Sequence, residues 1–326
     1  MASLRGIARR AAPTCSIIRS VWRRYGQLFD PDATGAWPFT HAALPTPWHV
    51  EGDTFRVFVA GRDKSNRSSI GFVDIELRPD SARVIGCCST PILRPGPLGA
   101  FDDSGVLPSC LTTVTTGTGN ELLLYYTGVA LGVTVPFYYL VGLARSRDGI
   151  SWERWSNAPF LERTPVDPLL VASPWIVLDA QTFHMWYVSG VRWSIEPDGP
   201  RHYYHIRHAT SVDGIQWQRT GAVAIDFSAG EYALSRPTIC RASGGFRMWF
   251  AARGRYYQIY EASSIDGTTW RRKQDPVLTP SPSGWDSEMT CYPAVFEHQG
   301  QLYMLYNGNG YGRSGFGLAI WEDDSC

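Results

Sequence analysis

The chain has 326 residues, of which 44% are hydrophobic and 13% aromatic, with 13 Trp and 16 Tyr. This composition supports a large apolar core and excludes a mainly disordered chain. Thirty basic and thirty acidic residues give a formal net charge of zero, which excludes a general electrostatic attraction to nucleic acid or to a membrane surface.

Residues 1–20 are predicted to form a basic flexible tail before the folded domain. They include Arg5, Arg9, Arg10 and Arg19 and no acidic residue. No apolar stretch of useful length follows, so a tail is favoured over the alternative of an organellar leader. The sequence also lacks any run of about eighteen apolar residues. Its seven cysteines are odd in number and lack C-x-x-C spacing, so we expect a reducing, cytoplasmic location.

A motif of the form Ala-x-Ser-x-Asp-Gly-x-x-Trp occurs three times, at 144–152, 209–217 and 262–270. A unit that recurs at such intervals indicates a repeat architecture. An aromatic second strand is expected in each of five units, at 55–59, 122–126, 184–188, 247–251 and 302–306. Four short strands per unit predict an all-β fold, a five-bladed β-propeller. This single domain spans 21–326, with blades near 37–93, 101–161, 167–227, 231–279 and 284–321.

The last unit ends after its third strand, near 318–321, which would leave an unpaired sheet edge. Trp22-Arg-Arg24 resembles Trp270-Arg-Arg272, which is predicted to begin a fourth strand. We therefore expect residues 22–29 to supply the missing strand and to close the last blade.

The Asp-Gly turns of the repeated motif place Asp148, Asp213 and Asp266 at equivalent positions. A tight turn followed by a Trp that packs between blades accounts for all three. We expect them to be turn residues and not catalytic groups.

The loops expected on one face carry a concentration of basic residues in a chain with no net charge. They are Arg62, Lys64, Arg67, Arg192, Arg201, Arg236, Arg253, Arg255 and Arg313. Guanidinium groups near a concave floor suit an anionic ligand such as a uronate, a sugar phosphate or a nucleotide sugar. The alternative is that these arginines pair with Asp63, Glu231, Asp286 and Glu288, or are solvated at the rim.

The expected catalytic candidates are acidic residues and histidines on the same face. They are Asp103 (or Asp102), Glu231, Asp286, Glu288 and His41. Glycosidic cleavage needs two carboxyl groups across the bond, and Asp103 with Glu288 is the preferred pair. Either acid could instead orient arginines, and His41 could be a base or a hydrogen-bonded structural residue.

The expected substrate-binding residues come from the same loops. They are Arg62, Asp63, Arg192, Trp193, His205, Arg236, Arg253, Tyr292, Asn307, Asn309 and Arg313. The two asparagines suit sugar hydroxyls but are also ordinary turn residues. The spacing His202-x-x-His205-x-x-His208 does not place three imidazoles on one face of a strand, so no metal site is predicted.

The blade pattern and several short motifs together resemble the five-bladed glycosidase-like superfamily, which includes glycoside hydrolase families 43, 62, 32 and 130. The motifs are Asp103-Ser-Gly-Val-Leu-Pro-Ser109, Ala172-Ser-Pro174, Ser235-Arg-Pro237 and Trp285-Asp-Ser-Glu288. The resemblance covers roughly 22–321 and extends to glycosidase-like proteins of bacterial polysaccharide gene clusters. It implies an axial funnel that handles a sugar, a carboxylate at Asp103, and no cofactor beyond a possible structural calcium.

The chain departs from this family where family 43 places its base and its acid, on blades one and three. Those positions hold Thr40-His41 and Ala172-Ser173, so the hydrolytic set is incomplete or relocated. The leading hypothesis is a glycosidase-like enzyme acting on an anionic sugar or glycoconjugate, by cleavage or transfer. The alternatives are a glycoside phosphorylase, a non-catalytic glycan-binding propeller, and a lyase or cyclase with His41 or His205 as base. We expect a small-molecule or glycan partner and neither nucleic acid nor membrane.

Overall fold

The computed structural model describes residues 19–33, 40–79, 81–117 and 119–324. Within these residues the chain forms twenty β-strands, the single 3-10 turn η1 (Pro31–Ala33) and the four-residue helix α1 (Asn309–Gly312). Residues 1–18 of the expected tail, and the expected start of the first blade at residue 37, lie outside the described residues. No helix in the described part of the chain is long and apolar enough to span a bilayer.

The strands form successive antiparallel meanders because each strand pairs with the next along the chain. The described residues contain five such units. The first strands are β2 (Thr40–Glu51), β6 (Gly105–Thr116), β10 (Val171–Asp179), β14 (Ala233–Ala242) and β18 (Cys291–His298). The second strands are β3 (Thr54–Arg62), β7 (Gly119–Leu131), β11 (Thr182–Glu196), β15 (Gly245–Arg253) and β19 (Gln301–Asn307).

The third and fourth strands complete each unit toward its outer edge. The third strands are β4 (Ser68–Arg78), β8 (Phe137–Ser146), β12 (Gly199–Ser211), β16 (Tyr257–Ser264) and β20 (Phe316–Asp324). The fourth strands are β5 (Ser81–Cys87), β9 (Glu153–Arg154), β13 (Val223–Ile225), β17 (Arg271–Arg272) and, in the last unit, the N-terminal β1 (Arg19–Phe29).

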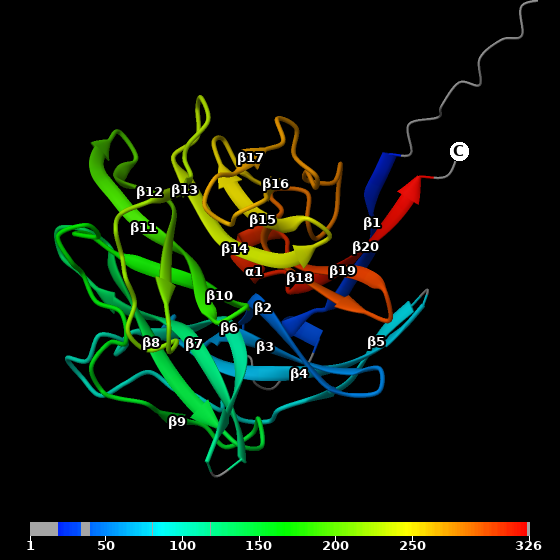
Figure 1. Ribbon diagram of the computed structural model, residues 1–326, viewed down its shortest axis with the longest axis horizontal. Coiled ribbons are helices and arrows are strands. Elements are labelled where there is room, and N and C mark those ends of the chain that lie inside the picture. The colour runs from blue at the N-terminus through cyan, green and yellow to red at the C-terminus, as the bar shows by residue number, and fades with distance from the viewer. Residues whose placement is uncertain (1–18, 34–39, 80, 118, 325–326) are drawn as a thin grey trace, which may run out of the picture.

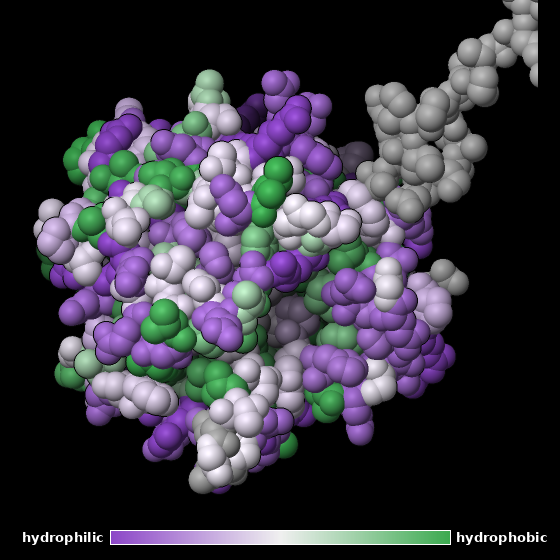
Figure 2. Space-filling view, viewed as in Figure 1, coloured by the Kyte–Doolittle hydropathy of each residue, from purple (hydrophilic) through white to green (hydrophobic). Residues whose placement is uncertain are grey.

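The first strands of the units surround the centre of the molecule. β2 contacts β6, β6 contacts β10, β10 contacts β14, β14 contacts β18, and β18 contacts β2. Figure 1 shows these strands at the middle of the view, with β5, β9, β13, β17 and β1 toward the outside. The space-filling view of the same face is hollowed near its middle (Figure 2). Residues far apart in the sequence therefore meet at the centre.

Strand β1 closes the last unit by pairing antiparallel with β20. The register places Trp22 opposite Trp321, and Trp22 also packs edge-on against Trp249 at 6.0 Å between ring centroids. This is the pairing predicted from Trp22-Arg-Arg24. The strand begins at Arg19, two residues before the expected start of the domain at residue 21.

Each first strand is irregular at a residue that precedes a proline. These residues are Leu44, Leu107, Ser173, Arg236 and Tyr292. The strand register shifts at or next to this residue in every unit, and four of the five have φ between 46° and 54°. Proline cannot donate a ladder hydrogen bond and disfavours the helical region for the residue before it. Non-glycine residues at positive φ are strained and cluster at functional sites. The repeated bulge therefore makes the centre of the molecule a candidate functional site.

The repeated Asp-Gly turns are built in the same way in all three copies. In the first, the Asp148 carboxylate accepts hydrogen bonds from the backbone N–H of Ile150 and Ser151, and Ser146 Oγ accepts one from Gly149. The turns at Asp213 and Asp266 repeat these contacts. The following Trp152 packs edge-on against Phe58 of the first unit. The structural interpretation of the three turns is confirmed.

Candidate active site

A pocket of about 280 Å³ lies where the units converge. It is lined by Ala43, Leu44, Arg62, Leu107, Phe137, Tyr139, His202, Tyr204, Arg253, Tyr257, Tyr292 and Tyr311. These residues come from first, second and third strands and from α1, and every unit contributes at least one. We call this cavity the axial pocket. Its volume is close to the lower end of the range for small-molecule sites, which suits a ligand of about one sugar ring.

Aromatic rings form most of the wall of the axial pocket. Phe137 and Tyr139 stack at 4.3 Å, and Tyr257 lies 6.3 Å from Tyr292 and 6.1 Å from Tyr311, between ring centroids. Flat aromatic faces supply apolar contact area, and tyrosines add hydroxyl groups at their edges. This combination matches a sugar, whose ring has apolar C–H faces and polar edges.

Two arginines give the axial pocket a positive charge. The Arg253 guanidinium lies 5.4 to 5.8 Å from the ring centroids of Tyr232, Tyr257 and Tyr311. Arg62 donates to the side chain of Asn66. Neither arginine has an ion pair with a described residue, and none of the described residues that line the pocket is Asp or Glu. The pocket is therefore suited to an anionic group.

His202 and a pair of tyrosines supply the groups in the pocket that can move protons. The His202 ring stacks on Tyr204 at 4.8 Å between centroids, and the hydroxyl oxygens of Tyr204 and Tyr257 lie 2.7 Å apart. Burial, followed by the charges of Arg253 and Arg201, lowers the pKa of His202 to about 4. Burial raises the pKa of both tyrosines. At neutral pH the imidazole is therefore neutral and both tyrosines keep their protons.

Three of the expected binding residues line the pocket, namely Arg62, Arg253 and Tyr292. The sequence-based expectation omitted His202 and most of the aromatic wall. A signal for these omitted residues exists, because Phe137, Tyr139, His202, Tyr204 and Tyr257 all lie in the first half of a third strand. In the second, third and fourth units the residue five positions before the alanine of the repeated motif is a tyrosine, and all three of these tyrosines line the pocket.

Arg236 lies at the centre but not in the pocket. It is 1% exposed, and its guanidinium donates to the carbonyl oxygens of Pro108 and Pro45 and to Thr46 Oγ1. These acceptors belong to the first and second units, so the side chain crosses the centre. The prediction that Arg236 clamps a ligand directly does not agree with this placement, because its donors are directed at the protein.

The acids Asp286 and Glu231, expected to be catalytic, are held in ion pairs inside their own units. Asp286 is 2% exposed and accepts from Arg24 Nε at 3.2 Å and from Tyr306 Oη at 3.0 Å. Glu231 accepts two hydrogen bonds from Arg272, at 2.5 and 2.7 Å. Neither carboxylate is therefore a free acid, but their partners Arg24 and Arg272 are not among the loop arginines that were expected to pair with them.

The same ion pair recurs in the second and third units. Asp102 pairs with Arg154 and Tyr126, and Asp167 pairs with Arg219 and Tyr187. In each case an acid before the first strand meets the arginine of a Trp-x-Arg sequence. We call this contact the unit brace. The brace explains why the Trp-x-Arg pattern repeats.

The preferred catalytic pair, Asp103 and Glu288, is not brought together at the axial pocket. Asp103 accepts hydrogen bonds from the Gly99 backbone and from Ser104 Oγ, which places it in a loop turn. Glu288 is exposed, and its backbone N–H donates to Asn309 Oδ1. Neither lines the pocket, although Glu288 lies beside α1, which carries the lining residue Tyr311.

The two histidines expected at the site have different surroundings. His205 is 5% exposed, and its ring nitrogens contact Asp226 and Arg207, so it is a structural residue. His41 contacts Thr40, and burial with the nearby charges of Arg62 and Arg313 lowers its pKa to about 4. His41 therefore lies close to a pocket arginine but outside the lining.

Two of the expected binding residues, Asn307 and Trp193, support the wall of the pocket and do not line it. Asn307 is fully buried, accepts from the Leu44 backbone and donates to the carbonyl oxygens of Ala42 and Gly315. It therefore fixes Leu44 in the wall. Trp193 packs 5.2 Å from Phe137 and 5.5 Å from His202, between centroids, as a second layer behind the wall.

The remaining expected residues are engaged in local contacts away from the pocket. Asn309 donates to the Gly284 carbonyl, and Asp63 caps a turn by accepting from backbone N–H groups. Arg313 pairs with Asp32, and Arg192 lies 3.6 Å over the ring of Tyr203. None of the four lines the axial pocket.

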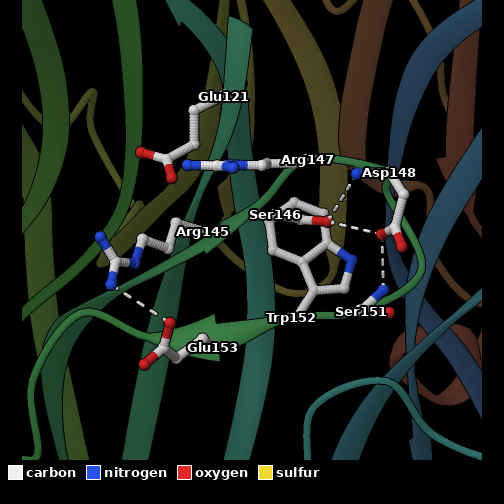
Figure 3. A pocket seen from close by; sticks show the side chains of 8 residues that line it. All are labelled: Glu121, Arg145, Ser146, Arg147, Asp148, Ser151, Trp152 and Glu153. Carbon is white, nitrogen blue, oxygen red and sulfur yellow. Dashed lines mark hydrogen bonds and ion pairs between the residues drawn. The ribbon is translucent and has the colours of Figure 1, made fainter. Parts of the chain in front are cut away.

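A wider groove of about 430 Å³ lies on the surface at the first Asp-Gly turn. Figure 3 shows its lining, with Arg145 paired to Glu153 on one side and the Ser146–Asp148 turn on the other. The polar groups of the turn are directed at one another. This groove is a consequence of the turn and is a weaker candidate for a ligand site than the axial pocket.

A calcium ion at the axis, which the family resemblance allows, does not fit the residues there. Calcium prefers several carboxylate and carbonyl oxygens, whereas the described lining presents two guanidinium groups and no carboxylate. The described residues also contain no group of three or more His, Cys, Asp or Glu arranged to hold a metal.

Solved structures with a similar fold include one described as a glycoside hydrolase, with a TM-score of 0.69 and 18% identity over 91% of each chain. A second belongs to the GH130 family of mannoside phosphorylases and glycoside hydrolases, with a TM-score of 0.68 and 14% identity over 96% of each chain. A third is a thermostable family-43 glycoside hydrolase, with a TM-score of 0.62 and 15% identity, covering 87% of this protein and 88% of that one. The protein thus has the propeller-like fold of glycoside hydrolases.

No protein-family model matches the sequence. Two proteins of Mycobacterium tuberculosis match nearly the whole chain. They are the uncharacterized proteins MT1551, of strain CDC 1551, and Rv1502, of strain H37Rv. Each is 44% identical over 304 residues, which cover 93% of this chain and 99% of the relative. The chain therefore belongs to the same family as MT1551 and Rv1502.

Proposed function

We propose that the protein is a glycosidase-like enzyme that acts on an anionic sugar in the axial pocket. The observation that carries the proposal is the lining itself, which combines an aromatic wall with Arg62 and Arg253 and has no acid among its described members. In this proposal the five meanders are the blades of one propeller domain. The thiols of Cys110, Cys240 and Cys291, which are not in disulfide bonds, support a reducing, cytoplasmic location.

The role of the arginines is to bind the negative charge of the ligand. Each guanidinium can present two parallel N–H groups to a carboxylate or a phosphate. The rings of Tyr257 and Tyr311 keep the Arg253 side chain beside the cavity. The anion is either part of the sugar or a separate inorganic phosphate, as a phosphorylase would require.

The test is a screen of anionic and neutral glycosides, with and without inorganic phosphate, for release of reducing sugar or sugar phosphate. Arg253→Gln and Arg62→Gln should each weaken binding of anionic ligands at least tenfold, because each removes one charged contact. Arg255→Gln is the matched control, since Arg255 is exposed and outside the lining. Equal affinity of wild type and both pocket variants for every anionic sugar would refute the proposal.

A second function, glycan binding without turnover, is supported by the absence of a carboxylate among the described lining residues. The usual glycosidic mechanism needs two carboxyl groups, and Glu288 is the one expected acid whose carboxylate has no hydrogen bond or ion pair with a described residue. Binding of an anionic sugar without any product, unaffected by Glu288→Gln, would establish this function in place of the enzymatic one.

A further inference from the structure

The described lining of the axial pocket contains groups suited to proton abstraction and proton donation but no carboxylate of the kind used in glycoside hydrolysis. The neutral His202 ring, the Tyr204–Tyr257 hydroxyl pair and Arg253 lie next to one another. Neither ring nitrogen of His202 has a hydrogen bond to a described residue, so a lone pair is available. This set differs from the expected pairing of two acids.

We infer that the pocket cleaves a 4-linked uronate by β-elimination, with His202 as the base and the Tyr204–Tyr257 pair as the acid. This inference rests on the proposed function, since it requires an anionic sugar in the axial pocket. It assigns the negative charge to a carboxylate attached to C5 of the sugar. That carboxylate makes the C5 hydrogen acidic, which a neutral sugar or a phosphate ester would not do.

The bonds and protons balance without water or any other co-reactant. His202 removes the C5 proton, and the C5–H electron pair is first delocalised onto the carboxylate. The same pair then forms the C4–C5 double bond. The C4–O bond breaks, and the leaving oxygen takes a proton from the tyrosine pair. The imidazolium then returns its proton to the tyrosinate, which restores the starting state. The products are an unsaturated uronate and an alcohol.

The electrostatics of the pocket favour the intermediate of this reaction. Removing the C5 proton delocalises negative charge onto the carboxylate, where Arg62 and Arg253 are available to stabilise it. A bound carboxylate also offsets the guanidinium charge that contributes to the low pKa of His202, which makes the imidazole a stronger base in the complex. A carboxylate in the wall would oppose the developing charge, and the described lining has none.

The tyrosine pair is arranged to donate one proton. At 2.7 Å, one hydroxyl donates to the other, and the accepting hydroxyl keeps its own proton for a ligand. Because both side chains are buried and line the pocket, water competes weakly for that proton. After donation, the second hydroxyl and Arg253 stabilise the tyrosinate.

The experiment incubates the full-length protein with oligosaccharides of 4-linked galacturonate, glucuronate and mannuronate, and records reducing ends together with the ultraviolet absorbance of the new conjugated double bond. Both signals rising together would support the inference. Reducing ends without absorbance would overturn it and leave the proposed function standing. Neither signal from any of these substrates would overturn it as well, and turnover of other anionic glycosides would then decide the proposed function separately.

Variants separate the two proton transfers. His202→Ala should lower the elimination rate at least a hundredfold and abolish exchange of the C5 hydrogen with deuterium from solvent. Tyr204→Phe and Tyr257→Phe should lower the elimination rate by a similar factor. Both variants should still catalyse exchange of the C5 hydrogen with deuterium. The controls are Tyr203→Phe and His49→Gln, whose side chains lie outside the pocket lining. Loss of exchange in the tyrosine variants, with native thermal stability, would contradict the assigned roles.

Discussion

At the scale of single residues, Arg236 shows how a buried charge can stabilise the centre of a ring of strands. Its guanidinium is 1% exposed and donates to acceptors on two other units. Desolvation by burial lowers its pKa to about 10, so it stays charged at neutral pH. No acid pairs with it among the described residues, and its charge therefore adds to the positive potential beneath the axial pocket.

Arg236→Ala should lower the free energy of unfolding by about 2–5 kcal/mol, because the carbonyls of Pro45 and Pro108 lose their donors in a buried site. The measurement is denaturant unfolding followed by tryptophan fluorescence. Arg255→Ala, at an exposed position, should stay within about 0.5 kcal/mol of wild type. Similar stability of the two variants would show that the central contacts of Arg236 contribute little.

His208 should make folding stability depend on pH. Burial, followed by the neighbouring His184, lowers its pKa to about 4, below the unfolded value of about 6.5. The unfolded state therefore binds more protons between these two values. Stability contributed by neutral His208 is present above about pH 6.5 and is lost as the pH falls toward 4, by at most about 3 kcal/mol.

The measurement is the free energy of unfolding from pH 7 to pH 4 for wild type and His208→Gln. As the pH falls, the free energy of unfolding should decrease less steeply in the variant than in wild type. The two slopes should differ by up to about 1.4 kcal/mol per pH unit. His41 and His202 also have pKa values lowered to about 4, so the contribution of His208 is the difference between the two slopes. His208 is 5% exposed and has Nε2 3.0 Å from His184 Nδ1. Identical slopes for the two proteins would contradict the assignment.

At the scale of elements, the unit brace connects the loop before a first strand to the fourth-strand arginine of the same unit. Asp167 has the densest contacts, since it accepts from Arg207, Arg219, Tyr187 and Ser189 at 2.7 to 3.3 Å and is fully buried. A buried carboxylate is stable there because two guanidinium groups and two hydroxyls replace its hydration.

Asp167→Asn should destabilise the protein by about 3–5 kcal/mol, because it leaves two buried or half-buried arginines without their counter-ion. Asp198→Asn is the matched control, since Asp198 is exposed and pairs with Arg201 at the surface. Asp198→Asn should lower the free energy of unfolding by less than about 1 kcal/mol. Both variants can be compared by thermal and denaturant unfolding, and equal losses would refute a structural role for the brace.

The sequence predicts these elements better than it predicts the site. The Asp-Gly turns depend on residues within five positions of one another, so the three copies could be recognised and their turn role predicted. The brace joins Asp286 to Arg24, 262 positions apart, and no local pattern shows that contact. Asp286 and Glu231 therefore resembled free catalytic acids. The aromatic wall could be found only by comparing the starts of the third strands across repeats.

At the scale of the whole molecule, closure depends on the first and last described strands, β1 and β20, pairing in one sheet. β1 supplies the outer strand of the unit that β18, β19 and β20 form. The axial pocket takes Tyr292 and Tyr311 from this last unit and Ala43, Leu44 and Arg62 from the first. The position of the last unit beside the first therefore determines whether the pocket is complete, although β1 itself contributes no lining residue.

Trp22→Ala tests this link between the ends and the pocket. Trp22 is 4% exposed and packs against Trp249 and Trp321 at 6.0 and 5.2 Å between ring centroids. Removing its ring should lower the free energy of unfolding by about 3–5 kcal/mol. Trp155→Ala, which removes a 48% exposed ring, should lower it by less than about 1 kcal/mol. Since the ring closes as a whole, Trp22→Ala should also lower the denaturant concentration at which a pocket ligand is released, in parallel with global unfolding. Release of ligand in the variant well before unfolding would show instead that the last unit separates from the first independently of the rest.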